Sequence, residues 1–206
     1  MNKFIQKLIK EQFSINDLDF SDDAQEYGTN IFNKAVIHPY YQNILDGTAT
    51  KDEIKELNSL TGFVVSKNKD DLRKIIEFYS LKYPKDSLNW LDVSRITDMS
   101  YLFKETKYNG NISKWDVSHV TDMSYMFLGL YYDLTPFNKD ISKWDVSSVT
   151  NMQDMFYHSE FNKDISKWDV SNVENMTSIF MGSKFKQDLS QWDISKLKYG
   201  KYEIMF

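Results

Sequence analysis

The residues best placed to do chemistry are aspartates that recur at one position of a repeated motif. In all copies but the first, the aspartate lies two residues after Lys or Gln and two before Ser, as in Lys143-Trp-Asp145-Val-Ser147. The repeated residues are Asp92, Asp116, Asp145, Asp169 and Asp193. If the motif is a parallel strand, neighbouring copies lie about 4.8 Å apart and their carboxylates form a column. Such a column could hold Ca²⁺ or serve as the close carboxylate pair of a retaining glycosidase.

The pattern gives this catalytic or metal-binding role little support. Acid–base chemistry needs two carboxylates in different environments, whereas a repeat supplies identical ones. His38, His119 and His158 occupy unrelated positions, and the chain has no cysteine. It also lacks a phosphate-binding glycine loop and a nucleophile elbow. We therefore expect no enzyme activity, no metal site and no cofactor.

Two interpretations of the repeated aspartates and their neighbouring lysines, which we call the Lys–Asp row, remain open. In one, each aspartate bonds to neighbouring backbone, Ser or Lys and is a structural signature of the repeat. In the other, the outward side chains form a polar face that binds a protein partner. The residues of this face are Lys143, Asp145, Lys167 and Asp169.

The repeat itself predicts the elements that position these residues. The aspartates are separated by 24, 29, 24 and 24 residues, which is a period of 24 with one insertion of five. Periods of 20 to 29 residues are typical of leucine-rich repeats, and Ile141-x-x-Trp144-x-Val146 fits their strand signature. The following Met152-x-x-Met155-Phe156 has the apolar spacing of a short helix or 3₁₀ segment. We predict an α/β solenoid, a leucine-rich-repeat-like right-handed coil with a short parallel sheet.

The repeated aromatic residues are expected to form the shared core of stacked coils. A single coil cannot bury its apolar face alone, so neighbouring coils must cover it. We expect this structural role, rather than a sugar-stacking platform, for Trp115, Trp144, Trp168, Trp192, Phe127, Phe156 and Phe180.

The chain before the repeats predicts a helical N-terminal cap over residues 1–62. Within it, Thr50-Lys-Asp-Glu53 has the pattern of a capping box. A short strand at 63–65, a helix over 70–81 and a strand over 88–93 predict a βαβ lead-in at 63–94. The solenoid then spans 63–206, with 24-residue repeats at about 88–195 and a C-terminal cap at 196–206.

The motif F-N-x-D-I-S-x-W-D-V-S-x-V-T-x-M-x-x-M-F resembles the BspA-type leucine-rich-repeat family of bacterial surface proteins and the similar repeat proteins of mycoplasmas. The resemblance extends over about residues 63–195. It implies a leucine-rich-repeat-like solenoid and, as in many members, adhesion or host contact at the cell surface.

The insertion of five residues lies between Phe127 and Phe137 and interrupts the regular array. Insertions in solenoids form surface loops that often bind partners, and Tyr is a favoured interface residue. We therefore expect Tyr131, Tyr132 and Leu134 to anchor a partner. In the alternative interpretation, the insertion is a tolerated bulge whose Leu130 or Leu134 packs back on the core.

Composition narrows the class of partner. The chain has 206 residues and a formal net charge of -5, without a cluster of Lys or Arg, so we expect no nucleic acid. No apolar run approaches the ~20 residues of a membrane span. Without a signal-peptide pattern or a lipidation cysteine, we expect a cytoplasmic protein, with a cell-surface or secreted one as the alternative that the resemblance implies.

Taken together, these features predict a non-enzymatic protein-binding repeat module of bacterial or mobile-element origin. A cell-surface adhesion protein and an intracellular inhibitor of a host defence complex are the alternatives.

Overall fold

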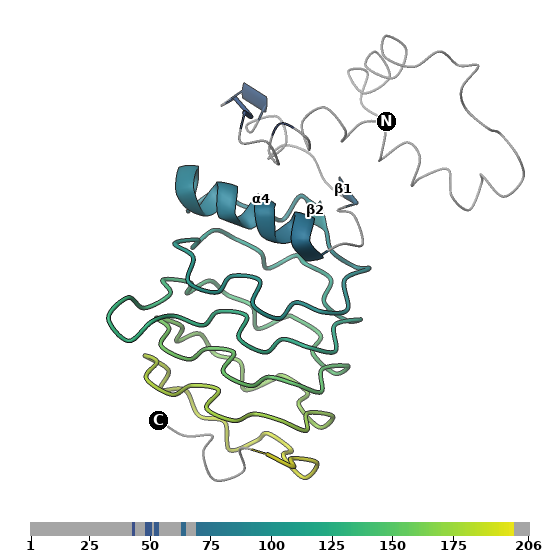
Figure 1. Cartoon of the computed structure of the whole chain (residues 1–206). Helices are drawn as coiled ribbons and strands as arrows, with labels where there is room; N and C mark the ends of the chain where they lie inside the picture. Colours follow the sequence, from purple (N-terminus) through teal and green to yellow (C-terminus); the bar gives the residue numbers. More distant parts are fainter. Residues whose placement is uncertain (1–42, 44–47, 51, 54–62, 65–68, 200–206) are drawn as a thin grey trace, which may run out of the picture. The chain divides into compact units, whose positions relative to one another are not determined.

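The computed structural model describes residues 43, 48–50, 52–53, 63–64 and 69–199 (Figure 1). The chain divides into two compact units, Met1–Leu57 and Asn58–Phe206. Most of the expected N-terminal helical cap, residues 1–62, lies outside the described residues. So does the end of the expected C-terminal cap, residues 200–206.

The predicted capping box in the first unit is confirmed. The Glu53 carboxylate accepts hydrogen bonds from the Thr50 backbone N–H at 2.7 Å and from the Thr50 hydroxyl at 3.0 Å. The Glu53 backbone N–H donates to Thr50 Oγ1 at 3.3 Å. The hydrogen bond from the Thr50 backbone also lowers the pKa of the Glu53 carboxyl, because it stabilises the charged form.

The second unit opens with a βαβ arrangement. Strand β1 (Phe63–Val64) pairs in parallel with β2 (Leu91–Asp92), and helix α4 (Lys69–Lys82) lies between them in the chain. The predicted helix is confirmed and extends one residue further at each end. Its apolar residues recur at helical spacing, so that Leu72, Ile75, Ile76 and Tyr79 are completely buried. No helix in the described part of the chain has the length and apolar character to cross a membrane.

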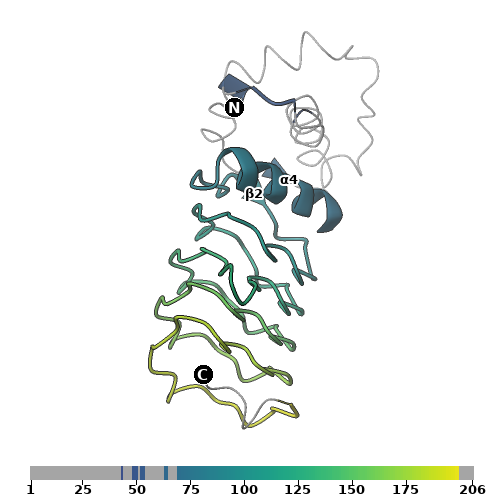
Figure 2. The same cartoon turned by 60° about the vertical axis from the view of Figure 1, so that its left-hand side comes forward.

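After β2 the chain forms coils that lie one above another (Figure 2). Parallel bridges join each coil to the next at the repeat spacing. The residues bridged in succession are Asp98, Asp122, Asn151, Asn175 and Tyr199. Backbone hydrogen bonds extend this ladder, as from the Phe127 N–H to the Met155 carbonyl at 2.9 Å and from the Phe156 N–H to the Ile179 carbonyl at 2.9 Å.

The location of this ladder corrects the sequence-based prediction. The Ile-x-x-Trp-x-Val segments form no strand within residues 112–195, and the Met-x-x-Met-Phe segments form no helix there. Instead, the ladder runs through the Met-x-x-Met-Phe segments. Their backbone N–H groups donate alternately to the next coil and to a carbonyl of the same coil. Phe127 donates to the next coil, whereas Leu128 donates to the carbonyl of Tyr125 in its own coil at 3.2 Å. Left-handed residues such as Tyr125, with φ of 59°, make this alternation geometrically possible.

The coils turn where an Asp or Asn side chain accepts a backbone N–H two residues on, and the three inner coils each have three such places. In one coil, Asp140 Oδ1 accepts the N–H of Ser142 at 2.9 Å and Asp145 Oδ1 accepts that of Ser147 at 3.1 Å. Asn151 Oδ1 makes the third such bond, to Gln153 at 3.2 Å. These Asx turns satisfy backbone donors where the chain changes direction.

The core joins the coils through aromatic side chains. Rings of successive coils stack, with Phe127 and Phe156 at a centroid distance of 5.4 Å and an interplanar angle of 4°. Each repeated tryptophan is buried and donates its indole N–H to a carbonyl of the preceding coil, as Trp168 does to Ile141 at 3.1 Å. Equivalent bonds are made by Trp115, Trp144 and Trp192. The tryptophans therefore combine apolar burial with a polar bond between coils.

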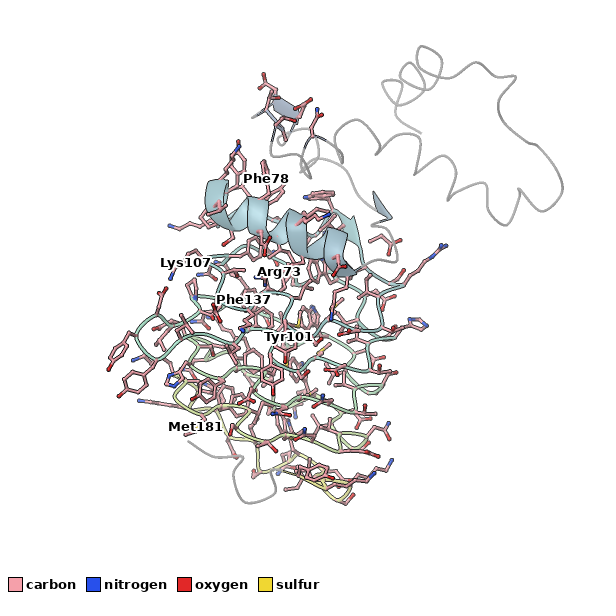
Figure 3. All side chains as sticks on the ribbon, in the orientation of Figure 1. Arg73, Phe78, Tyr101, Lys107, Phe137 and Met181 are labelled. Carbon is pink, nitrogen blue, oxygen red and sulfur yellow. The ribbon has the colours of Figure 1, made fainter. Side chains whose placement is uncertain are left out.

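Arg73 of α4 closes the hydrogen-bonding ladder at the first coil. In the inner coils, the carbonyls of Met126 and Leu128 accept N–H groups from the preceding coil. The matching carbonyls of the first coil belong to Leu102 and Lys104, and the Arg73 guanidinium donates to them at 3.0 and 3.1 Å. It also donates to the Tyr101 carbonyl at 2.8 Å. Figure 3 shows Arg73 between α4 and the coils. One guanidinium thus replaces the donors of a missing coil.

Replacing Arg73 with Met should therefore destabilise the second unit. Methionine keeps most of the side-chain length but leaves the Leu102 and Lys104 carbonyls without the donors that Arg73 supplies, and we expect a loss of about 1 to 3 kcal/mol. Urea unfolding followed by tryptophan fluorescence measures this loss. Arg95→Met is the control, because Arg95 is an exposed arginine of a nearby turn. Equal unfolding midpoints for the two variants would contradict the capping role.

Candidate partner-binding site

The inserted segment forms a tight hairpin on the side of the coil stack. The Leu130 N–H donates to the Asp133 carbonyl at 3.1 Å, and the Asp133 N–H donates back to Leu130 at 3.0 Å. These paired bonds leave Tyr131 and Tyr132 as the two residues at the tip. Their side chains are 70% and 95% exposed, respectively. The third expected anchor, Leu134, is only half-exposed.

The base of the hairpin is fixed to the coils on either side. Lys107 of the preceding coil forms an ion pair with Asp133. The Gly129 N–H donates to the Tyr157 carbonyl at 2.8 Å, and the Thr135 N–H donates to the His158 carbonyl at 3.2 Å. Gly129 fits because it has no side chain, since a Cβ there would lie 2.0 Å from the His158 carbonyl oxygen. The hairpin therefore leaves the stack at a defined position.

The ring of His158 packs against Tyr131 at the tip of the hairpin. Its ring lies 5.3 Å from that of Tyr131 and 4.4 Å from that of Tyr157, both in edge-to-face arrangements. His158 is almost completely buried and has a left-handed backbone, with φ of 46°. Gly182 leaves room for it, because a Cβ at that position would lie 2.4 Å from the imidazole.

Sequence reasoning did not identify His158 as a neighbour of the hairpin, or Gly182 and Met181 as neighbours of His158. Met181, in the same part of the next coil, accepts the His158 N–H on its carbonyl at 2.9 Å, and its side chain is 50% exposed. Leu130 is 49% exposed. We call Leu130, Tyr131 and Tyr132 the hairpin patch. The one available sequence signal was that large apolar residues occur here at positions that do not belong to the repeated core.

The Lys–Asp row lies on exposed parts of consecutive coils. Lys143, Asp145, Lys167 and Asp169 are all exposed. The carboxylates are engaged locally, since Asp169 Oδ1 accepts the Ser171 N–H at 3.0 Å and Asp145 Oδ1 accepts the Ser147 hydroxyl at 2.6 Å. In the part of the chain that the structure describes, no group of three or more His, Asp or Glu side chains is arranged to hold a metal ion. The row therefore offers charges but no assembled site.

The fold and the hairpin patch define a repeat protein built of stacked coils, and comparison with known proteins assigns its family. The family model described as "Mycoplasma protein of unknown function, DUF285" matches residues 71–159 and 128–206. These matches together cover well over half of the chain, which therefore belongs to this family. Their overlap is expected of a repeated sequence. No curated protein and no solved structure matches the chain.

The turn aspartates give the protein a defined response to acid. Hydrogen bonds from Ser171 lower the pKa of Asp169, and those from Ser166 lower the pKa of Asp164. A lowered folded-state pKa contributes stability above the unfolded value of about 3.9, and this contribution is lost as the pH falls through the folded value. We expect stability to decline below about pH 4 for this reason. Carboxyl ¹³C NMR should show both residues titrating below 3.9, and titration at or above that value would contradict the account.

Proposed function

We propose that this chain is a non-enzymatic protein-binding repeat module that recognises its partner through the hairpin patch and the adjoining face of the coils. As part of the same proposal, the stacked coils form a leucine-rich-repeat-like solenoid related to the BspA-type repeat proteins. The observation that carries the functional proposal is the pair of exposed tyrosines on a hairpin fixed at both ends.

The hairpin patch has the properties of an interface anchor. Tyrosine is enriched among residues that dominate binding energies, because it offers a large apolar surface together with a polar hydroxyl. Binding costs free energy when flexible groups become ordered. The ion pair of Asp133 and the ring contact between Tyr131 and His158 already restrict the hairpin before any partner arrives.

Two biological settings fit such a module. The resemblance to BspA-type proteins favours adhesion or host contact at the cell surface. The small size and mild acidity of the chain suit an intracellular inhibitor of a host protein complex equally well. Fractionating the native cells and locating the intact chain by immunoblotting separates these settings, because surface exposure is required by the first and excluded by the second.

Replacing both tip tyrosines with Ser should weaken partner binding without unfolding the coils. Loss of a tyrosine hot spot of at least 2 kcal/mol corresponds to roughly a 30-fold decrease in affinity. The measurement is affinity capture with the tagged full chain, using quantitative mass spectrometry to find proteins that the double variant fails to retain. Each such protein is then produced, and its Kd is measured with both chains.

The matched control is Tyr199→Ser, because Tyr199 is a comparably exposed tyrosine on the last described coil. The control should bind as the unmodified chain does. A partner that the unmodified chain and the double variant bind with equal affinity would contradict the role of the hairpin patch.

A further inference from the structure

One surface position combines a fixed backbone with a side chain that changes from coil to coil. It is the third residue of each Met-x-x-Met-Phe segment and of the equivalent segments that have Leu or Ile in place of the second Met. The occupants are Tyr101, Tyr125, Asp154 and Ser178, which have φ of 62°, 59°, 51° and 52°, respectively. The Lys–Asp row, in contrast, repeats nearly unchanged.

The left-handed backbone at this position is unfavourable for residues other than Gly, Asn and Asp. For such residues it costs of the order of 1 kcal/mol. The ladder requires this geometry in each coil, yet none of the occupants is glycine. Tyr101, Tyr125 and Ser178 therefore carry backbone strain. Backbone strain of this kind clusters at functional sites.

Neighbouring occupants form an organised cluster. The rings of Tyr101 and Tyr125 stack at 4.5 Å with an interplanar angle of 5°. The Gln153 side-chain amide donates to the Tyr125 hydroxyl at 2.6 Å and to Asp154 Oδ2 at 3.2 Å. The Asn175 side-chain amide in turn donates to Gln153 Oε1 at 3.1 Å. The stacked tyrosine rings are therefore linked through the Gln153 side-chain amide to the Asp154 carboxylate, because that amide bonds to both Tyr125 and Asp154.

The charge of Asp154 is poorly compensated. Its side chain is half-buried, and no Lys or Arg within residues 69–199 forms an ion pair with it. Burial raises the pKa of the Asp154 carboxyl, which the bonds from Gln153 and Tyr125 oppose only in part. The pKa values of Asp164 and Asp169, whose carboxylates accept backbone N–H groups, are shifted in the opposite direction. A bound cation would stabilise the Asp154 carboxylate.

We propose that Tyr125, Gln153 and Asp154 bind an arginine side chain of the partner protein. The guanidinium would pair with the Asp154 carboxylate, to which the Gln153 side-chain amide donates at 3.2 Å. Its planar face would lie against the tyrosine stack. Arginine combines carboxylate pairing and aromatic stacking better than lysine does. The Tyr101 ring already has a cation nearby, because Lys104 Nζ lies 5.6 Å from its centroid.

This inference rests on the proposed protein-binding function and specifies the chemistry of the partner. It is tested without that partner, by titrating the full chain with N-acetyl-arginine amide. Amide chemical shifts of Tyr125, Gln153 and Asp154 report binding. The matched probe is N-acetyl-citrulline amide, which has a nearly identical shape and no charge. We expect the arginine probe to shift these resonances with at least tenfold higher affinity than the citrulline probe.

The variant Asp154→Asn tests the carboxylate itself. Asparagine tolerates a left-handed backbone and removes the half-buried charge, so its Tm should rise while affinity for the arginine probe falls at least tenfold. The control is Asp164→Asn, which should leave affinity for the arginine probe unchanged, because asparagine can keep the turn, as Asn111 does in its bond to Ser113 at 2.9 Å. Binding and melting are measured separately. A loss of probe affinity in a variant that is more stable therefore cannot result from unfolding.

The outcomes separate this inference from the role of the hairpin patch. The double tyrosine variant of the hairpin should keep full affinity for the arginine probe, and its loss of partner binding bears only on the hairpin. Equal binding of the arginine and citrulline probes, or undiminished binding by Asp154→Asn, would overturn the arginine site. A lysine probe, N-acetyl-lysine amide, that binds as tightly as arginine would overturn the preference for guanidinium.

Discussion

The structure depends on the hydrogen bonds that each coil makes with the next through its Met-x-x-Met-Phe segment. The N–H groups of Phe103, Phe127 and Phe156 all donate to a carbonyl one coil further along. The side chains of the same residues stack in the core, so one short segment supplies both the polar and the apolar contacts between coils. A coil without neighbours would lose both. Stability in such an array comes from interfaces between repeats.

This dependence explains the features at the boundaries of the array. At the first coil, the carbonyls have no preceding coil to bond, and Arg73 supplies the donors from α4. At the turns, Asp and Asn side chains satisfy the backbone groups that the ladder does not reach. The repeated Asp and Asn side chains at these turns therefore bond to the backbone of the array. We therefore propose that binding involves positions where the coils differ, namely the hairpin patch and the cluster around Asp154.

The sequence predicted local features well where one short pattern determines them. The capping box at Thr50 and Glu53 follows from a local exchange of hydrogen bonds. The boundaries of α4 follow from the periodicity of residues such as Leu72 and Ile76. The 24-residue period also indicated which residues occupy equivalent positions. For the aspartates, the interpretation as local turn residues agrees with the bonds of Asp145 and Asp169.

The sequence could not show which segment forms the ladder. Apolar spacing in Met152-x-x-Met155-Phe156 fits a helix, but the segment bonds to the next coil, as from the Asp154 N–H to the Thr177 carbonyl at 2.9 Å. The role of Arg73 was hidden for a similar reason, since its acceptors lie about 30 residues away in another element. The support that His158 and Gly182 give to the hairpin likewise depends on two coils being side by side.

Amide hydrogen exchange tests most directly the claim that hydrogen bonds between coils hold the array together. The account predicts that the amides of Phe127 and Phe156, which donate between inner coils, exchange together and only through cooperative unfolding. The amides of exposed Lys143 and Asp145 should exchange far faster in the same experiment. Rapid or independent exchange of Phe127 and Phe156 under native conditions would contradict the account.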